Sequence, residues 1–285
     1  MATRLRPVPS EAVLITGCSS GIGNATAEHL AAEGWKVYAT ARRPETIADL
    51  AEKGCETLAL DVTDEKSMAG AVEKVSQAEG AVGVLVNNAG YSQSGAVESV
   101  PMDQVRRQFD TNVFGLLRMS QLVLPGMRDQ RWGKIVNIGS MGGRLTFPGG
   151  GIYHATKYAV EALSDALRFE VRGFGVDVIL VEPGLIVTSF GDTASATVGE
   201  VGDGPYERFN RHVAKMTQAA YKGPMVKLGG GPEAVAKTIG KALKSGRPRP
   251  RYPVTPSAHL MINQRRFMPD QLWDLVMRTQ FPTPR

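Results

Sequence analysis

Residues 11–32 read EAVLITGCSSGIGNATAEHLAA and combine a short apolar run, a glycine-rich loop and a helical pattern. The run Glu11–Ile15, which lies between Pro9 and Gly17, is typical of a buried strand. The pattern from Ala25 to Ala32 predicts a helix. A strand, a glycine loop and a helix start in this order form a phosphate site, because exposed backbone amides and the positive helix end attract anions. The stretch therefore predicts the start of an α/β fold.

The glycines of this loop, Gly17, Gly21 and Gly23, give the spacing G-x-x-x-G-x-G. This differs from the G-x-G-x-x-G spacing of the common dinucleotide-binding fingerprint. Glycines at such positions let the backbone approach a phosphate closely. The alternative is a plain turn that only ends the strand.

A second expected strand, Lys36–Ala41, is followed directly by Arg42 and Arg43. In sheets that bind NAD, an acidic residue about 20 residues beyond the glycines binds the ribose 2′-hydroxyl, whereas an arginine accommodates a 2′-phosphate. The tip of this strand carries no acid, so Arg42 favours NADP(H) over NAD(H). A solvated arginine pair is the alternative, because arginine suits phosphate and exposed surface equally well.

Further strands and helices alternate along the chain. Strands are expected at Glu56–Leu60, Val82–Val86, Lys134–Ile138 and Val176–Val181, and helices at Pro44–Lys53, Asp64–Glu79, Met102–Arg128, Ile152–Arg172, Tyr206–Tyr221 and Pro232–Ser245. The range 102–128 holds two helical segments that meet near Asp110–Asn112. Strands and helices that alternate this regularly indicate a parallel sheet.

Tyr153 and Lys157 stand four residues apart, so in a helix they share one face. A lysine charge within about 4–6 Å lowers the pKa of a phenol, and such a tyrosine can act as a general acid or base. Ser140 follows the strand Lys134–Ile138, at the strand end where open α/β sheets place ligands, so its hydroxyl is expected to hold a substrate oxygen. The alternative is a helix-surface pair without a chemical role.

Polar side chains follow two other strands. Asp61 is expected either to accept from an adenine amino group or to cap the next helix. Asn87 and Asn88 either bond the backbone of neighbouring strands or form a turn. Asn112 lies among apolar residues and needs partners there, so it either braces backbone or holds a water.

The composition suits a globular protein, with 42% hydrophobic and 21% charged residues in a chain of 285. The net charge is +5, but the basic residues are dispersed and no nucleic-acid-binding module accompanies them, so no nucleic-acid partner is expected. Cys18 and Cys55 are too few for a disulfide framework and lack metal-ligand spacing, which favours a reducing cytoplasm. Neither a signal peptide nor a transmembrane segment is expected, because no apolar stretch is long enough.

Taken together, these motifs resemble the short-chain dehydrogenase/reductase superfamily, in its single-domain branch. The matching parts are Thr16–Gly23, Asp61, Asn87–Gly90, Asn112, Ser140, Tyr153–Lys157 and Pro183-Gly184 with Thr188. The resemblance implies a Rossmann-type, doubly wound parallel sheet of about seven strands in the order 3-2-1-4-5-6-7, flanked by helices and closed by a C-terminal helical substrate lid.

The resemblance also implies a role for each site residue. Tyr153 is the general acid in carbonyl reduction and the base in alcohol oxidation, and Lys157 lowers its pKa and bonds the nicotinamide ribose. Ser140 holds the substrate oxygen, Asn112 supports a water linked to Lys157, and no metal is needed. The implied cofactor-binding residues are Gly17, Ser19, Ser20, Gly21, Ile22, Gly23, Arg42, Asp61, Val62, Asn88, Ala89, Gly90, Tyr153, Lys157, Pro183, Gly184, Ile186 and Thr188.

The chain beyond Thr188 is expected to cover the substrate within one domain of residues 1–285. Residues 189–230 form the expected lid, with a loop before the helix Tyr206–Tyr221, and residues 255–285 form a C-terminal extension. Apolar lid residues suggest an apolar substrate or simply pack the lid on the core: Phe190, Phe209, Met216, Tyr221 and Met225. The extension is similar to that of 17β-hydroxysteroid and retinol dehydrogenases. Its amphipathic segments cover the substrate mouth, join subunits or rest on a membrane surface, and contact with protein is favoured over the membrane.

The expected function is therefore an NADP(H)-dependent oxidoreductase that transfers hydride between the nicotinamide and a hydrophobic ketone or secondary alcohol, steroid-, retinoid- or lipid-like. A non-catalytic NADP(H)-binding sensor and an NAD-dependent alcohol dehydrogenase are the alternatives. A sensor has no need of the complete set of Tyr153, Lys157, Ser140 and Asn112, so their joint presence favours an enzyme. By the resemblance, a cytoplasmic homodimer or homotetramer is expected.

Overall fold

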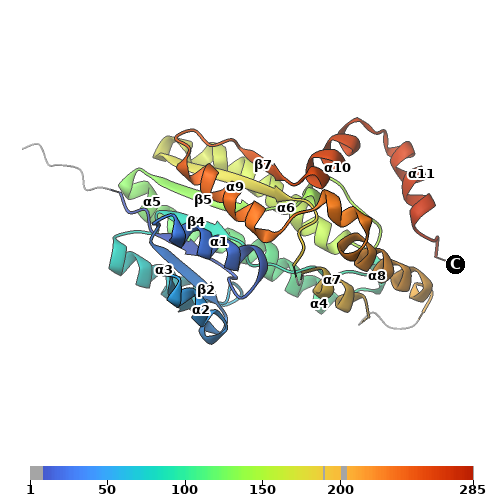
Figure 1. Cartoon of the computed structure of the whole chain (residues 1–285), viewed down its shortest axis with the longest axis horizontal. Coiled ribbons are helices and arrows are strands. Elements are labelled where there is room, and N and C mark those ends of the chain that lie inside the picture. The colour runs from blue at the N-terminus through green and yellow to red at the C-terminus, as the bar shows by residue number, and fades with distance from the viewer. Residues whose placement is uncertain (1–8, 189, 200–203, 285) are drawn as a thin grey trace, which may run out of the picture.

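The computed structural model describes residues 9–188, 190–199 and 204–284, and seven strands among them form one parallel sheet (Figure 1). The strands are β1 (Val13–Ile15), β2 (Val37–Ala41), β3 (Glu56–Ala59), β4 (Val84–Asn87), β5 (Gly133–Ile138), β6 (Val176–Pro183) and β7 (Arg251–Val254). Their order is β3-β2-β1-β4-β5-β6-β7, and every pairing is parallel. This confirms the predicted Rossmann-type sheet and its strand order. The carboxyl ends of all strands consequently meet at one edge of the sheet.

Helices cover both faces of the sheet. One face carries α1 (Gly21–Ala32), α2 (Ala48–Glu52) and α9 (Pro232–Lys244), and the other carries α3 (Glu65–Glu79), α5 (Gly115–Gln130) and α6 (Gly151–Val171). In the central strand β1, Val13 and Ile15 pack toward the first layer, whereas Leu14 packs toward the second. Fully burying one such side chain contributes about 1.5–3 kcal/mol. The two layers therefore hold the loops at the strand ends in fixed positions.

A π-helical turn, Asp110–Phe114, joins α4 (Met102–Phe109) to α5. The predicted meeting of two helical segments at this point is confirmed. Turns of this type are wider than an α-turn and are frequent at functional sites. This one carries Asn112, whose side chain is only 2% exposed.

One predicted helix is only partly correct. Residues 44–53 form a 3₁₀ turn, Pro44–Ile47, that precedes the short α2. The hydroxyl of Thr46 donates to the carbonyl oxygen of Arg43 at 2.7 Å, and such local bonds compete with the α-helical ladder. Other 3₁₀ turns lie at Val97–Ser99, Met141–Gly143, Arg172–Phe174 and Pro224–Leu228.

The segment expected to form the lid contains a helix that the sequence did not predict. Where a loop was expected, α7 (Phe190–Gly199) precedes α8 (Glu207–Lys222). Ala194 and Val198, four residues apart, are both buried, so α7 has a narrow apolar face. Its glycine and threonine content concealed that face, because these residues are typical of loops.

The C-terminal extension consists of α10 (Pro256–Phe267) and α11 (Asp270–Gln280), drawn in red in Figure 1. Between β7 and α10, Thr255 has a φ of 84°, which is unusual for a β-branched residue. Next to it, the Ser257 hydroxyl accepts a hydrogen bond from the Leu185 amide at 3.0 Å. A Cβ on Gly184 would lie 2.3 Å from the same hydroxyl oxygen. The extension is thus bonded to the loop that follows β6.

Candidate active site

A cavity of about 1190 Å³ lies at the carboxyl ends of the strands. Of the predicted catalytic residues, Ser140, Tyr153 and Lys157 line it, whereas Asn112 does not. All predicted cofactor-binding residues except Gly23 line it as well. The structure therefore brings the sequence motifs, which are spread from residue 17 to residue 188, to one place.

The glycine loop, which connects β1 to α1, forms part of the cavity wall. Gly17 has a φ of 73°, and a Cβ on Gly23 would lie 2.3 Å from the Gly17 carbonyl oxygen. The Asn88 amide donates to the carbonyl oxygens of Thr16 at 3.0 Å and Gly17 at 2.9 Å, which pins the loop to β4. Of the two roles expected for Asn88, the structure shows the bonding of neighbouring backbone.

The start of α1 suits a pyrophosphate. Ser20 is its N-cap residue but makes no side-chain capping hydrogen bond. Ser19, Ser20, Gly21 and Ile22 all line the cavity, so the amino end of α1, whose first amides have no partner within the helix, borders it. Free amides and a positive helix end are the groups that bind phosphate, and the residues present therefore fit a dinucleotide cofactor.

Arg42 lines the cavity beyond β2, whereas its neighbour Arg43 does not. Asp61 also lines it, with its Oδ1 accepting from the Thr63 amide at 2.9 Å and the Thr63 hydroxyl at 2.7 Å. The cap of α3 is Asp64, which accepts from the amides of Lys66 and Ser67. Of the two roles expected for Asp61, the helix cap is therefore wrong.

Tyr153, Ser140 and Lys157 meet where β5 ends against α6. Tyr153 and Ser140 both line the cavity, and Ser140 lies near enough to lower the pKa of the phenol. The Oγ of Ser140 accepts from the Gly142 amide at 3.0 Å. The Nζ of Lys157 donates to the Ile138 carbonyl oxygen at 2.8 Å and lies 5.8 Å from the centre of the Tyr153 ring. The two side chains share one face of α6, as their spacing predicts.

Burial dominates the pKa values of both groups. Burial raises the pKa of Tyr153 above its usual value, and the polar side chain of Ser140 partly offsets the rise. Burial also lowers the pKa of Lys157 to about 8, against the opposing charge of Glu161. The pKa of Tyr153 is thus raised in the protein alone, and its lowering by Lys157 stays a prediction.

Asn112 acts on backbone. Its Nδ2 donates to the Tyr91 carbonyl oxygen at 2.9 Å and to the Thr156 hydroxyl at 3.2 Å, and its Oδ1 accepts from the Tyr91 amide at 3.1 Å. Of the two predicted roles, the structure shows the bracing of backbone. Asn112 holds the loop after β4 against the helix that carries Tyr153.

A sequence model of short chain dehydrogenases matches residues 11–199, which include the glycine loop and Tyr153–Lys157. The chain belongs to the short-chain dehydrogenase family. The predicted superfamily and the predicted class of enzyme, an oxidoreductase acting on CH–OH and C=O groups, are confirmed by this match and by the relatives below.

Curated relatives of this dehydrogenase extend beyond the matched residues. The uncharacterized oxidoreductase YbbO of Escherichia coli is 34% identical over 272 residues, which are 95% of each chain. The NADPH-dependent 3-dehydrocapnine reductase of Ornithobacterium rhinotracheale is 34% identical over 274 residues, 92% of this chain and 94% of the reductase. Human 17-beta-hydroxysteroid dehydrogenase type 1 is 38% identical over 256 residues, 84% of this chain and 76% of the human protein.

Solved structures share the fold of the dehydrogenase. A short-chain dehydrogenase from Streptomyces avermitilis has a TM-score of 0.78 at 34% identity, covering 95% of this chain and 98% of its own. A serine dehydrogenase complexed with NADP⁺ has a TM-score of 0.74 at 26% identity (86% and 94%), and an NAD⁺-bound xylitol dehydrogenase has 0.73 at 25% (88% and 99%). The family uses nicotinamide cofactors of both kinds.

His154 is a residue of the dehydrogenase site that sequence reasoning missed. Its Nδ1 donates to the Gly142 carbonyl oxygen at 2.8 Å, because its Nε2 accepts from the Phe147 amide at 3.2 Å. Burial lowers the pKa of this imidazole, which favours the neutral ring that these two bonds require. His154 thus ties the loop after Ser140 to α6. Its place next to Tyr153 was the only signal in the sequence.

The part of the dehydrogenase cavity that α7, α8, α10 and α11 line is mostly apolar. Its lining includes Phe147, Phe190, Val213, Met216, Tyr221, Met261, Trp273, Val276, Met277 and Phe281. Phe190 lies beside Tyr153, with the ring centres 5.7 Å apart. Phe209 instead packs α8 against Ala96 and Val198, and the side chain of Met225 lies outside the described residues. The lid residues therefore divide between the two expected roles.

Proposed function

We propose that this dehydrogenase is an NADP(H)-dependent oxidoreductase that transfers hydride between the nicotinamide and a hydrophobic ketone or secondary alcohol. The observation that carries the proposal is that Tyr153, Ser140 and Lys157 share one cavity with the glycine loop and with an apolar end. A cofactor bound along the glycine loop supplies or accepts the hydride. The protein's own residues supply orientation and a proton.

Each side chain has a distinct task in this proposal. Ser140, which lines the same cavity as the Tyr153 phenol, holds the substrate oxygen beside that phenol. Tyr153 donates its proton to the oxygen during reduction and takes it back during oxidation. Lys157 keeps a positive charge near the phenol, 5.8 Å from its ring centre. Asn112 positions the loop at Tyr91, and the buried apolar wall excludes water from the reacting groups.

The preference for NADP(H) rests on Arg42. Its side chain lines the cofactor end of the cavity, and β2 ends without an acidic residue that would repel a 2′-phosphate. The relative from Ornithobacterium rhinotracheale is named as NADPH-dependent. An NAD-dependent alcohol dehydrogenase remains the alternative, because related structures hold either cofactor.

The preference for a hydrophobic substrate rests on the lining between α8 and α11. Rings and thioethers line this end of the cavity, and methionine adapts to irregular apolar shapes. The human relative is named for a hydroxysteroid, so a steroid-, retinoid- or lipid-like ketone suits the chain. A non-catalytic sensor is disfavoured, because nucleotide binding alone does not require the Tyr153–Ser140 pair.

We also propose that the chain folds as one domain and forms a cytoplasmic homodimer or homotetramer. Exposed aromatic side chains, Phe114 on the π-helical turn and Tyr158 and Phe169 on α6, support an oligomer through these helices. The free, buried thiols of Cys18 and Cys55 support a reducing compartment. Analytical ultracentrifugation tests the oligomer, which a purely monomeric protein at micromolar concentration would contradict.

The experiment that tests the function is oxidation of NADPH and NADH with a panel of steroid, retinal and long-chain aliphatic ketones. Turnover with NADPH is expected to be lost in Tyr153→Phe and retained in Tyr158→Phe, a matched change on the exposed side of the same helix. Tight NADPH binding without turnover on any ketone would favour the sensor. A preference for NADH would contradict the role of Arg42.

A further inference from the structure

The helices α10 and α11 present apolar side chains on two sides. One side lines the substrate end of the cavity, with Met261 and Gln264 on α10 and Trp273, Val276 and Met277 on α11. Trp273 and Met277 are buried against Leu145, which precedes α6. The apolar side chains on this inner side are thus covered by the protein itself, as expected for an amphipathic helix.

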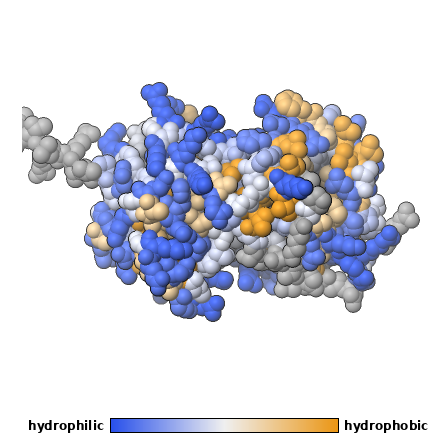
Figure 2. Space-filling model, in the orientation of Figure 1, coloured by the Kyte–Doolittle hydropathy of each residue, from blue (hydrophilic) through white to orange (hydrophobic). Residues whose placement is uncertain are grey.

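The other side leaves large apolar side chains in solvent. Leu260 and Phe267 on α10 are 53% and 78% exposed, and Leu272 and Leu275 on α11 are 47% and 57% exposed. Residues seven apart, or three apart, lie on one face of a helix, so each helix carries an exposed apolar pair. In Figure 2, hydrophobic surface is concentrated over the half of the molecule that carries these helices, whereas the half around α2 and α3 is mostly hydrophilic. We call these four residues the outer apolar patch.

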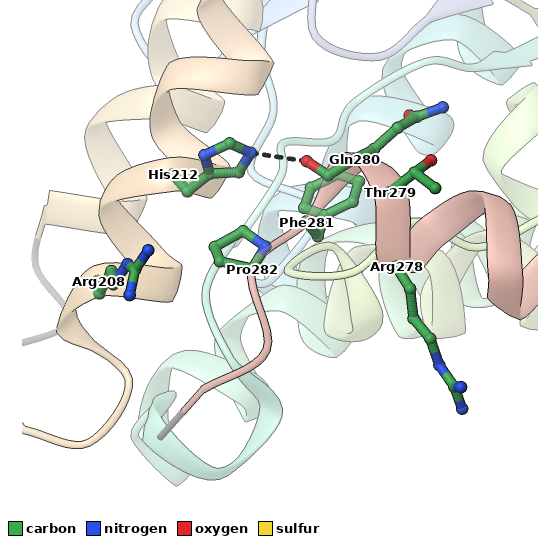
Figure 3. A pocket seen from close by; sticks show the side chains of 7 residues that line it. All are labelled: Arg208, His212, Arg278, Thr279, Gln280, Phe281 and Pro282. Atoms are coloured by element: carbon green, nitrogen blue, oxygen red, sulfur yellow. Dashed lines mark hydrogen bonds between the residues drawn. The ribbon is translucent and has the colours of Figure 1, made fainter.

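Positive charge accompanies the outer apolar patch. The guanidinium of Arg266 lies 5.5 Å from the centre of the Phe267 ring, and Arg278 follows Leu275 by one turn of α11. A pocket of about 320 Å³ borders α11, with Arg208, His212 and Arg278 in its lining (Figure 3). In that view the Arg278 side chain extends away from the pocket, and His212 Nε2 donates to the Gln280 carbonyl oxygen at 2.7 Å. Of the two acidic residues of α11, Asp270 is paired with Arg265, whereas Asp274 is exposed and lies between Leu272 and Leu275 in the sequence.

We propose that the outer apolar patch docks on an anionic phospholipid bilayer, with Phe267, Leu272 and Leu275 entering the interface and Arg266 and Arg278 meeting lipid phosphates. Apolar side chains flanked by arginines are the combination that binds such an interface, because burial of apolar area adds to attraction by anionic lipid. A second copy of the chain would have to match both the apolar and the basic groups. The bilayer supplies both complements at once.

Docking at this place connects the bilayer to the cavity. The helices α10 and α11 carry the outer apolar patch on one side and line the cavity with the other. An apolar substrate dissolved in lipid would therefore lie one helix thickness from the cavity. This consequence rests on the proposed hydrophobic substrate, whereas the docking itself does not. Lipid binding can therefore be measured without any substrate or cofactor.

The first experiment is sedimentation of the full chain with vesicles of phosphatidylcholine alone and with phosphatidylserine added. Binding is expected with phosphatidylserine, and it is expected to weaken as salt rises. The variant Leu272→Ser/Leu275→Ser is expected to weaken it by about ten-fold or more, because the apolar contacts are lost. Arg266→Ser and Arg278→Ser are each expected to weaken it by about five-fold, and only on the anionic vesicles.

The matched control is Phe174→Ser. Phe174 is also an exposed aromatic residue, with the guanidinium of Arg128 5.9 Å from its ring centre, but it lies in the turn before β6. Its vesicle binding is expected to equal that of the unchanged protein. Equal loss in Phe174→Ser and Phe267→Ser would overturn the proposal.

A second measurement follows the fluorescence of Trp273, with the four residues of the outer apolar patch unchanged. Trp273 is the tryptophan of α11, and the other two, Trp35 and Trp132, lie near the sheet. Brominated lipids in the vesicles are expected to quench its fluorescence, and Trp273→Phe is expected to remove that quenching. Absence of vesicle binding would overturn the proposal. The proposal would also be overturned if Leu272→Ser/Leu275→Ser lowered the molecular mass of the oligomer in solution without weakening vesicle binding. Such a result would show that a second copy of the chain covers the patch.

Discussion

The ammonium of Lys157 is hydrogen-bonded to the carbonyl oxygen of Ile138, at an Nζ to O distance of 2.8 Å. Ile138 is the last residue of β5, and Ser140 follows it by two residues. The bond therefore joins the end of this strand to the helix face that carries Tyr153. One lysine thus positions the strand end and places a charge beside the phenol.

Glu161 is expected to set the pH at which Lys157 loses its charge. Glu161 raises the pKa of Lys157, which burial lowers to about 8. The pKa of Glu161 is itself raised to about 7 by burial and by Glu182, so Glu161 is ionised in the range where Lys157 titrates. In Glu161→Gln the pKa of Lys157 should fall further. The loss of carbonyl reduction at high pH is then expected to begin at lower pH, measured as kcat/KM against pH.

The control for this change is Asp165→Asn. Both Glu161 and Asp165 form ion pairs with Arg251, at 3.1 Å and 2.5 Å, so both variants disturb that arginine. Only Glu161 acts on the pKa of Lys157. A profile that shifts equally in the two variants would show that the effect comes through Arg251.

Arg42 is expected to decide between the two nicotinamide dinucleotides. A hydrogen bond to a charged group is worth about 1.5–3 kcal/mol, so Arg42→Ala should raise the Kd for NADPH by about 10- to 100-fold and leave that for NADH nearly unchanged. Arg43→Ala is the matched control, because Arg43 follows the same strand but does not line the cavity. Titration of cofactor fluorescence measures both constants, and equal effects of the two variants would contradict the assignment.

Gly23→Ala is expected to abolish cofactor binding and to destabilise the protein. The new Cβ would lie 2.3 Å from the Gly17 carbonyl oxygen and 2.5 Å from Asn88 Nδ2, so the loop must move. Gly70→Ala is the comparison, because a Cβ there meets nothing within 4 Å and α3 gains a better helix former. That variant should gain about 0.5–1 kcal/mol. Thermal unfolding and NADPH titration of both proteins check the pair.

His154→Ala is expected to cost about 1–3 kcal/mol in the free energy of unfolding, because the Gly142 carbonyl and Phe147 amide lose their partner. Tyr158→Ala, on the exposed side of α6, should cost less. The folded-state pKa of His154 is lowered, so the unfolded state binds more protons near pH 6. Its contribution to stability is therefore present above the unfolded pKa, near 6.5, and is lost as pH falls below that value. Denaturant unfolding between pH 5 and 8 measures this loss, which should be absent in His154→Ala.

The sheet and the catalytic face could be predicted because they depend on local patterns. The order of elements and the glycines fix the path of the strands, and a spacing of four residues places Tyr153 and Lys157 on one side of a helix. The sign of the Tyr153 pKa shift could not be predicted, because it depends on how completely the fold buries the phenol. The partners of Asn112 likewise required the position of the Tyr91 backbone.

The part of the cavity wall that α11 forms could not be predicted from the sequence, for a different reason. An amphipathic pattern shows that α11 must cover something, but not that Trp273 meets Leu145 from a loop more than a hundred residues earlier. The helix α7 was missed because its apolar face is narrow. Contacts between distant segments of this kind are not expressed in any local periodicity.

Thr255, which connects the sheet to the C-terminal extension, has a positive φ and therefore a strained backbone. A residue held in this region costs of the order of 1–3 kcal/mol, and surrounding contacts must offset the cost. The hydrogen bond from Leu185 to Ser257 is one such contact. Loosening the loop after β6 should therefore release Thr255 and let α10 and α11 swing outward together. Hydrogen exchange is expected to show that α10 and α11 open together, as one unit. Independent exchange of the amides in the two helices would contradict the role of Thr255.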